Sequence, residues 1–359
     1  MGAFMIIALA LLGTAIYTVY LFLSVFFSAT KLGQGLILSV LIISSFGFLT
    51  TLILSRSVNN FLVHIFYIIF SLMVGLLFYL TIFAILFQLS KLVKLDIAPL
   101  ILTRIGVSLA IILFGIGVFD AAFSRVKDIS IKMNGLSSNW QGKKIVQISD
   151  LHLGGIYGIS FLDKQIYKIN ALNPDLIVIT GDLFDDTETN LQAFGPELAK
   201  LKAKEGVIFV PGNHDVSVGL EKIAPILATA NILTLRDQAV SINGLEIIGL
   251  DLHQLIKDDN NLVISNLEPY TGQARLLLKH VPMDISLAKN LNVDLQLSGH
   301  SHNGQMFPLS GITWFFYGKY QYGLHTEGTY NIYTSSGLGS WGPPVRTFNQ
   351  AEIVAITIN

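Results

Sequence analysis

Five short clusters in this sequence combine side chains that could bind a metal ion. Five of the eight histidines lie within them. The clusters read Ser149-Asp150-Leu151-His152, Gly181-Asp182-Leu183-Phe184-Asp185, Gly212-Asn213-His214-Asp215, Lys279-His280-Val281-Pro282 and Gly299-His300-Ser301-His302. Imidazole and carboxylate ligands favour divalent cations such as Mn, Fe, Co or Zn over Mg or Ca. The chain has no cysteine, which excludes disulfides and thiolate metal sites.

Four of the five clusters directly follow a run of apolar residues of the type that forms strands. We therefore expect them at the carboxyl ends of strands, where open α/β sheets build their sites. The clusters offer the ligand set of a two-metal site. It consists of Asp and Asn oxygens, four imidazoles and a shared carboxylate, that of Asp182. Two cations held about 3.5–4 Å apart would stabilise the attacking and leaving oxygens of a phosphoryl displacement, with a bridging hydroxide as nucleophile.

His214 differs from the other histidines of the clusters. It stands next to Asn213 in a tight turn, so the two side chains cannot easily face the same metal. We expect His214 to face the substrate and to donate a proton or hydrogen bond to the leaving oxygen. Asp215 either orients His214 or caps the helix that follows. Asp185 is expected to support the metal ligands, and Asp186 to be solvated.

The charged residues are distributed unevenly along the chain. Residues 1–123 contain only seven of the 47 charged side chains. Four apolar runs lie there, each close to or above the roughly 20 residues that cross the hydrocarbon core as a helix. They cover about residues 4–27, 36–54, 61–89 and 100–123. The short polar separators force neighbouring helices to run antiparallel, so we predict a four-helix transmembrane bundle for residues 1–123.

Residues 124–359 have the composition and patterning of one globular α/β domain. Apolar strand patterns alternate with helical ones, which predicts a layered α/β sandwich. We expect a first strand over 129–136 and a hairpin with its turn at Asn243-Gly244. Helices are expected at about 161–172, 189–203 and 218–230. Only about ten residues separate Phe123 from the core of that first strand, too few for a long tether, so the domain should lie close to the bilayer.

The ordered series Asp-x-His, Gly-Asp-x-x-Asp, Gly-Asn-His-Asp, His and Gly-His-x-His resembles the calcineurin-like metallophosphoesterases. The stretch from Gly299 to Gln305 and the tail from Ser336 to Arg346 resemble the membrane-associated branch of that superfamily. The resemblance implies an α/β sandwich of two mixed β-sheets flanked by helices. It also implies a first metal held by Asp150, His152, Asp182 and His302, and a second held by Asp182, Asn213, His280 and His300.

The chain departs from that branch at two places, neither of which removes a ligand. Asn303 stands where the branch often has Gly, and Val281-Pro282-Met283 replaces a more usual Asn-Pro-Asp, which affects the shape of the pocket. Arg346 either recognises a phosphate or forms a structural ion pair. The isolated His253 and His325 either line the pocket or are structural.

These features together predict a membrane-anchored hydrolase of phosphoester or pyrophosphate bonds that uses two divalent metal ions. Four spans are more than an anchor needs, so we expect a lipid-linked substrate and contacts with membrane lipids. The aromatic segment from Trp314 to Tyr320 either belongs to the core or dips into the lipid headgroups. A net charge of −1 gives no basic surplus, so no nucleic-acid partner is expected. The alternative is a membrane sensor or scaffold whose metal-binding domain has little turnover.

The expected location is the cell membrane, and the side that the catalytic domain faces rests on the charges of the loops. Lys31, Lys91 and Lys94 lie in the two loops of one side, while Arg56 and the start of the globular domain carry the charges of the other. The numbers of positive charges on the two sides are therefore nearly equal. Because charges on a large domain count less, the short loops favour a cytoplasmic position for themselves and an extracytoplasmic one for the catalytic domain.

Overall fold

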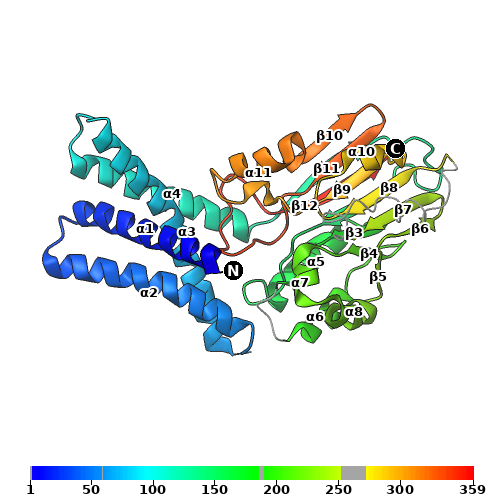
Figure 1. The fold of residues 1–359 in the computed structure, drawn as a ribbon. Coiled ribbons are helices and arrows are strands. Elements are labelled where there is room, and N and C mark those ends of the chain that lie inside the picture. The colour runs from blue at the N-terminus through cyan, green and yellow to red at the C-terminus, as the bar shows by residue number, and fades with distance from the viewer. Residues whose placement is uncertain (1, 59, 186–189, 252–271) are drawn as a thin grey trace.

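The computed structural model describes residues 2–58, 60–185, 190–251 and 272–359, with side chains from residue 10 onward. Four long helices form a bundle beside a two-sheet α/β domain (Figure 1). The helices are α1 (Gly2–Phe26), α2 (Lys31–Ser55), α3 (Phe61–Leu92) and α4 (Pro99–Ala122). The last three are long and apolar enough to cross a membrane, and α1 contributes a shorter apolar helix over its described side chains, Ala10–Phe26.

The starts of these helices follow from local chemistry. Thr30 precedes α2 and its hydroxyl accepts a hydrogen bond from the backbone N–H of Gly33, while Asn60 caps α3 through the N–H of Leu62. Pro99 opens α4, where its missing N–H costs nothing. Since α3 has 32 residues, it is about 48 Å long. That length exceeds the roughly 30 Å of a hydrocarbon core.

The globular domain contains two mixed six-stranded sheets, as the resemblance implied. The first has the order β1-β12-β2-β3-β4-β5 and the second β10-β11-β9-β8-β7-β6. The strands of the first sheet are β1 (Arg125–Ile131), β12 (Glu352–Ile358), β2 (Lys144–Ile148), β3 (Leu176–Thr180), β4 (Val207–Val210) and β5 (Ile232–Thr234). Those of the second are β10 (Gly323–Glu327), β11 (Tyr330–Thr334), β9 (Leu295–Ser298), β8 (Arg275–Lys279), β7 (Leu245–Leu250) and β6 (Gln238–Ile242). Strands β2 to β5 and β7 to β9 run parallel.

The two sheets pack face to face because their strands are apolar on both faces. Val178 and Ile208 of the first sheet share one buried cluster with Leu276 and Leu297 of the second. The outer face of the first sheet is covered by α5 (Ile159–Ala171), α6 (Phe194–Leu198), α7 (Asn213–Val218) and α8 (Leu220–Thr229). A shorter helix, α10 (Ile285–Asn290), covers the second sheet. The result is the layered α/β sandwich that the pattern predicts.

Several elements differ from the pattern-based prediction. The expected helix at 189–203 is reduced to a 3₁₀ turn and α6, because Asn170 bonds the backbone of Lys200 and Lys202 and replaces helical hydrogen bonds there. The helix expected at 218–230 begins at Leu220, after Gly219 with a φ of 102°. Strand β1 begins before residue 129 because it pairs with β12 from Arg125 onward. The hairpin turn at Asn243-Gly244 is confirmed between β6 and β7. Strand β10 and α11 (Ser310–Tyr317) were not predicted.

The bundle and the α/β domain are in direct contact. The side chain of Val345 packs into the core of the bundle, and a Cβ at Gly117 of α4 would lie only 2.4 Å from it. The N–H of Arg346 donates to the carbonyl of Gly117 at 2.7 Å, and Thr347 bonds the hydroxyl of Tyr79 on α3. The tail segment 343–347 therefore packs against α3 and α4. The α/β domain is in direct contact with the helices and is not separated from them by a flexible linker.

Candidate metal centre

In the structure all five clusters follow strands, although the apolar pattern predicted a preceding strand for only four of them. Asp150, Asp182 and Asn213 come after β2, β3 and β4 of the first sheet, while His280 and His300 come after β8 and β9 of the second. Because these strands run parallel within each sheet, their carboxyl ends lie at one edge. The candidate site therefore lies where the edges of the two sheets meet.

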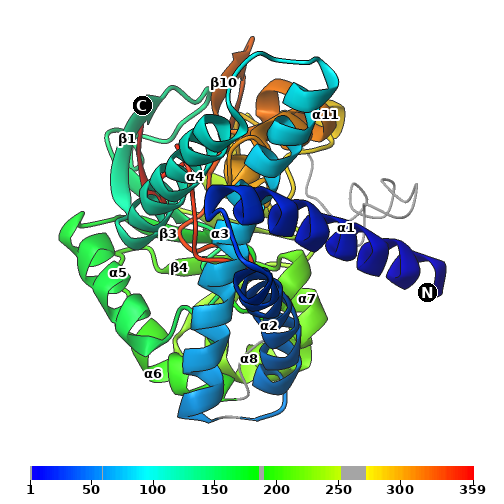
Figure 2. The ribbon, with the colours of Figure 1, turned by 90° about the vertical axis from the view of Figure 1, so that its left-hand side faces the viewer.

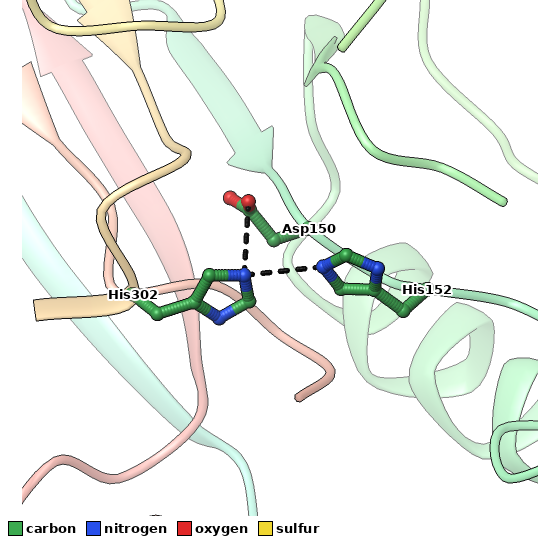
Figure 3. A group of neighbouring side chains, drawn as sticks. All are labelled: Asp150, His152 and His302. Carbon is green, nitrogen blue, oxygen red and sulfur yellow. Dashed lines mark hydrogen bonds and ion pairs between the residues drawn. The ribbon is translucent and has the colours of Figure 1, made fainter. Parts of the chain in front are cut away.

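The first group of ligands consists of Asp150, His152 and His302 (Figure 3). All three are buried. The Nε2 atoms of His152 and His302 lie 3.1 Å apart, and the Nε2 of His302 lies 3.3 Å from Oδ1 of Asp150. Two ligands of one cation with bonds near 2.1 Å lie about 3.0–3.4 Å apart. The donor set and its spacing therefore fit one divalent metal ion.

The second group surrounds Nε2 of His280. Within 3.2 Å of that atom lie Oδ2 of Asp182, Oδ1 of Asn213 and Nδ1 of His300. The Nδ1 of His280 faces the carbonyl of Thr180 at 2.8 Å, which leaves Nε2 free to act as a ligand when the ring is neutral. This group fits a second ion on the same grounds.

Asp182 connects the two groups. Its Oδ2 lies 3.2 Å from Nε2 of His280 and 3.9 Å from Nε2 of His152, so a single oxygen faces both. Its Oδ1 accepts a hydrogen bond from the backbone N–H of His214 at 2.8 Å. A Cβ on Gly212 would lie 2.1 Å from that Oδ1, so only glycine fits there. A carboxylate in this position could be shared by two ions, which stays a prediction from the sequence.

The charges at the site favour cation binding. Burial lowers the pKa of His152 to about 3 and that of His300 to about 4. Both rings are therefore neutral near pH 7, and each can donate a nitrogen lone pair to a metal ion. Burial acts the same way on His280, but the charge of Asp182 outweighs it and raises the pKa of His280 to about 10. Burial would raise the pKa of Asp182, yet His280 and His152 hold it below its usual range. A divalent cation would displace the proton of His280.

The backbone at the site is conformationally unusual. Five ligand residues have a positive φ, between 47° and 68°, and these are Asp150, His152, Asp182, His300 and His302. Such conformations cost roughly 1–3 kcal/mol each and persist where the surrounding fold holds them. The left-handed turns aim the side chains back toward the junction of the two sheets.

His214 stands beside the two ligand groups and outside both of them. Its Nδ1 lies 3.8 Å from Oδ1 of Asp185, and its ring meets that of His152 edge-on with 4.7 Å between centroids. Asp185, His152 and His214 form a third group, whose possible metal-ligand atoms all lie within 4.8 Å of one another. Asp186 and His253 lie outside the described residues.

Asp215 caps the turn and does not orient His214. Its carboxylate accepts hydrogen bonds from the N–H groups of Gly212, Leu183 and Phe184 at 2.9, 3.3 and 3.0 Å. Burial, followed by the negative charge of Asp182, raises the pKa of Asp215 to about 7. The carboxylate that faces His214 is that of Asp185. The sequence predicted only that Asp185 supports the metal ligands.

A cavity of about 460 Å³, which we call the metal-side pocket, opens over both ligand groups. Asp182 and His214 line its polar end, and Met306, Leu309 and Ile312 line its apolar wall. The neighbouring helix α11 exposes Trp314, Phe315 and Phe316 by 60, 79 and 67%. Trp314, Phe315 and Phe316 are therefore a surface feature beside the pocket, whereas Tyr320 at the end of the segment packs against the core beside the second sheet.

Among the described residues, the partners of Arg346 are carbonyl groups and not the carboxylate of a structural ion pair. It is fully buried, and its guanidinium donates to the carbonyls of Ser336, Gly339 and Asn349. Its Nη1 also lies 3.4 Å from Nδ1 of His302. Arg346 thus ties the tail to the first ligand group. The isolated His325 bonds the carbonyl of Tyr322 and is structural.

Arg346→Lys is expected to lower the melting temperature of the protein. The three carbonyls are bonded by the three separate nitrogens of the guanidinium, a spread that a compact ammonium does not reproduce. Each lost hydrogen bond to a buried charge costs about 1.5–3 kcal/mol. The loss should appear in thermal unfolding of the full-length protein, with weaker binding of one metal equivalent. The matched change Arg236→Lys, at an ion pair in which the arginine is 44% exposed and Asp251 is buried, keeps a cation beside that carboxylate and should have the smaller effect. Equal melting temperatures for both variants would contradict this role of Arg346.

Comparisons with known proteins bear on the same residues. Residues 143–304 match the family model described as calcineurin-like phosphoesterase. The chain is 33% identical over 244 residues to an uncharacterized metallophosphoesterase of Campylobacter jejuni, covering 65% of this chain and 63% of that protein. It is 35% identical over 240 residues to the uncharacterized metallophosphoesterase YkuE of Bacillus subtilis, covering 64% and 83%.

A relative with a membrane part is also similar to the chain. The transmembrane protein with metallophosphoesterase domain of Bos taurus is 28% identical over 294 residues, covering 76% of this chain and 64% of that protein. The chain thus spans less than two thirds of the length of the Campylobacter and bovine relatives.

Proposed function

Since the chain belongs to the calcineurin-like metallophosphoesterases, in the branch with N-terminal apolar helices, we propose that it is a membrane-anchored hydrolase of phosphoester or pyrophosphate bonds. The observation that carries the proposal is the single oxygen of Asp182 that faces both ligand groups at the floor of an open pocket. Two divalent ions, Mn, Fe, Zn or Co, would there supply positive charge for the phosphoryl oxygens and lower the pKa of water.

The protein's own side chains would complete the reaction. Asp150, His152, Asp182 and His302 would hold one ion, and Asp182, Asn213, His280 and His300 the other. His214 borders the pocket without belonging to either group, so it is available to donate a proton to the leaving oxygen. Asp185, 3.8 Å away, would orient its ring.

We propose that the substrate is linked to a lipid. The α/β domain is docked on the helices, and α11 exposes its aromatic side chains beside the pocket. Aromatic residues of this kind favour the membrane–water interface. The charges of the loops favour an extracytoplasmic side for the catalytic domain, as set out from the sequence.

Full-length protein purified in detergent with added Mn is expected to hydrolyse a panel of phosphodiesters and to lose that activity with a chelator. A lipid phosphodiester should have a higher kcat/KM than its soluble headgroup analogue in the same assay. Bound metal without hydrolysis of any member of the panel would favour the sensor or scaffold alternative. Equal kcat/KM for the lipid and its analogue would contradict the lipid-linked substrate.

A further inference from the structure

A second cavity, of about 390 Å³, adjoins the candidate site on the side of the bundle. We call it the helix-side pocket. It shares Asn213, His214, Trp341 and Pro343 with the metal-side pocket, so the two meet at the metal centre. Its remaining lining residues come from the bundle and the catalytic loops and are Phe48, Leu52, Arg56, Tyr67, Val74, Asp185, Ser217 and Gly342.

The helices reach this cavity because α3 is longer than a membrane span. The α/β domain contacts α3 near its middle, at Gly75 and Tyr79. The preceding half of α3 and the end of α2 therefore run on beside the domain and face α7, as Figures 1 and 2 show. We call this part, residues 48–58 and 60–74, the α2–α3 hairpin. Ile53 and Phe61 on its outer surface are 66 and 75% exposed.

The two walls of the helix-side pocket differ in chemistry. The wall supplied by the catalytic domain carries Asp185, Asn213 and His214, next to the place where a phosphoryl group would react. The wall supplied by the helices carries the apolar Phe48, Leu52 and Val74, together with Tyr67 and the charged Arg56. A molecule with a phosphoester at one end and a hydrocarbon chain at the other matches both walls, and the volume lies in the range of ligand pockets, about 300–1,000 Å³.

We propose that the helix-side pocket binds the alkyl or acyl chain of the substrate, so that the α2–α3 hairpin is part of the active site and not only an anchor. The proposal rests on the proposed phosphoesterase function and adds the location of the chain. The phosphoester lies at the metal centre, and its chain extends between α2 and α3 toward the bilayer. The metal-side pocket would then hold the remaining part of the substrate.

The test uses p-nitrophenyl alkyl phosphates with methyl to hexadecyl chains, assayed on the full-length protein in one detergent with Mn. Each buried methylene adds about 0.8 kcal/mol, or roughly fourfold in affinity. Wild type should therefore show a ratio of kcat/KM, hexadecyl over methyl, well above one. Val74→Trp and Leu52→Trp, which fill the pocket from different helices, should each lower this ratio roughly tenfold. Ile69→Trp, on the exposed surface of α3, is the matched control and should keep it.

The outcomes distinguish the proposed location of the alkyl chain from the phosphoesterase function on which it rests. Hydrolysis of the methyl ester with no preference for longer chains, or ratios unchanged in both pocket variants, overturns the inference and leaves the phosphoesterase function standing. A ratio lowered only by Ile312→Trp, in the metal-side pocket, places the chain along α11 and also overturns it. No hydrolysis of any ester by wild type refutes the proposed function itself. Melting temperature and bound metal identify a variant that fails to fold, in which case Val74→Leu replaces it.

Discussion

Asp182→Ala is expected to abolish phosphoester hydrolysis and the binding of both metal ions. One oxygen of Asp182 faces His280 at 3.2 Å and His152 at 3.9 Å, so the substitution removes a ligand from each group at once. Mutation of residues that merely support metal ligands costs about 10–100-fold in metal affinity or activity. Loss of a ligand shared by two ions should exceed that range. Elemental analysis and the kcat of the same purified sample measure the two losses together.

The control for Asp182→Ala is Asp163→Ala on the exposed surface of α5. Asp163 pairs with Lys200 at 3.4 Å and is more than half exposed, so its removal should leave metal content and kcat close to wild type. Retention of two metal equivalents by Asp182→Ala would show that Asp182 does not connect the two ions. Retention of one equivalent would assign Asp182 to a single group.

His214→Ala is expected to lower kcat by roughly two to four decades, the usual contribution of general acid catalysis. The metal content should stay at the wild-type value, because the ring of His214 belongs to neither ligand group. The loss should be smaller for p-nitrophenyl esters than for alkyl esters, since a good leaving group needs no proton. Steady-state kinetics on both ester types, with metal analysis, provide the measurement.

Two further variants test how His214 acts. Asp185→Asn keeps the size of the side chain and removes the charge 3.8 Å from Nδ1 of His214, so it should lower kcat less than His214→Ala. His325→Ala, a histidine bonded to Tyr322 away from both pockets, should leave kcat near wild type. Loss of metal from His214→Ala would instead make His214 a ligand. An equal loss of kcat for both ester types would exclude proton donation to the leaving group.

The sequence by itself determined the chemistry of the candidate site and the class of the fold. Apolar runs that end in Asp, Asn or His predict ligands at strand ends, because alternation and strand length are local properties of the chain. The long apolar runs likewise predict membrane helices, since a span depends only on length and composition. The turn at Asn243-Gly244 is likewise predictable from the local sequence, because both residues readily adopt a positive φ.

The tertiary structure alone decided how these parts meet. Asp185 faces His214 and Asp215 caps the turn, because the loop after β3 lies against the start of α7, an arrangement without any local signature. The backbone N–H of Arg346 meets the carbonyl of Gly117 on α4, hundreds of residues away in sequence, while its side chain bonds carbonyls of the tail itself. The helix-side pocket exists because α3 extends beyond its contact with the domain and carries the α2–α3 hairpin to the site. Each of these contacts depends on sheet order and helix packing, which arise only when distant segments bury their surfaces together.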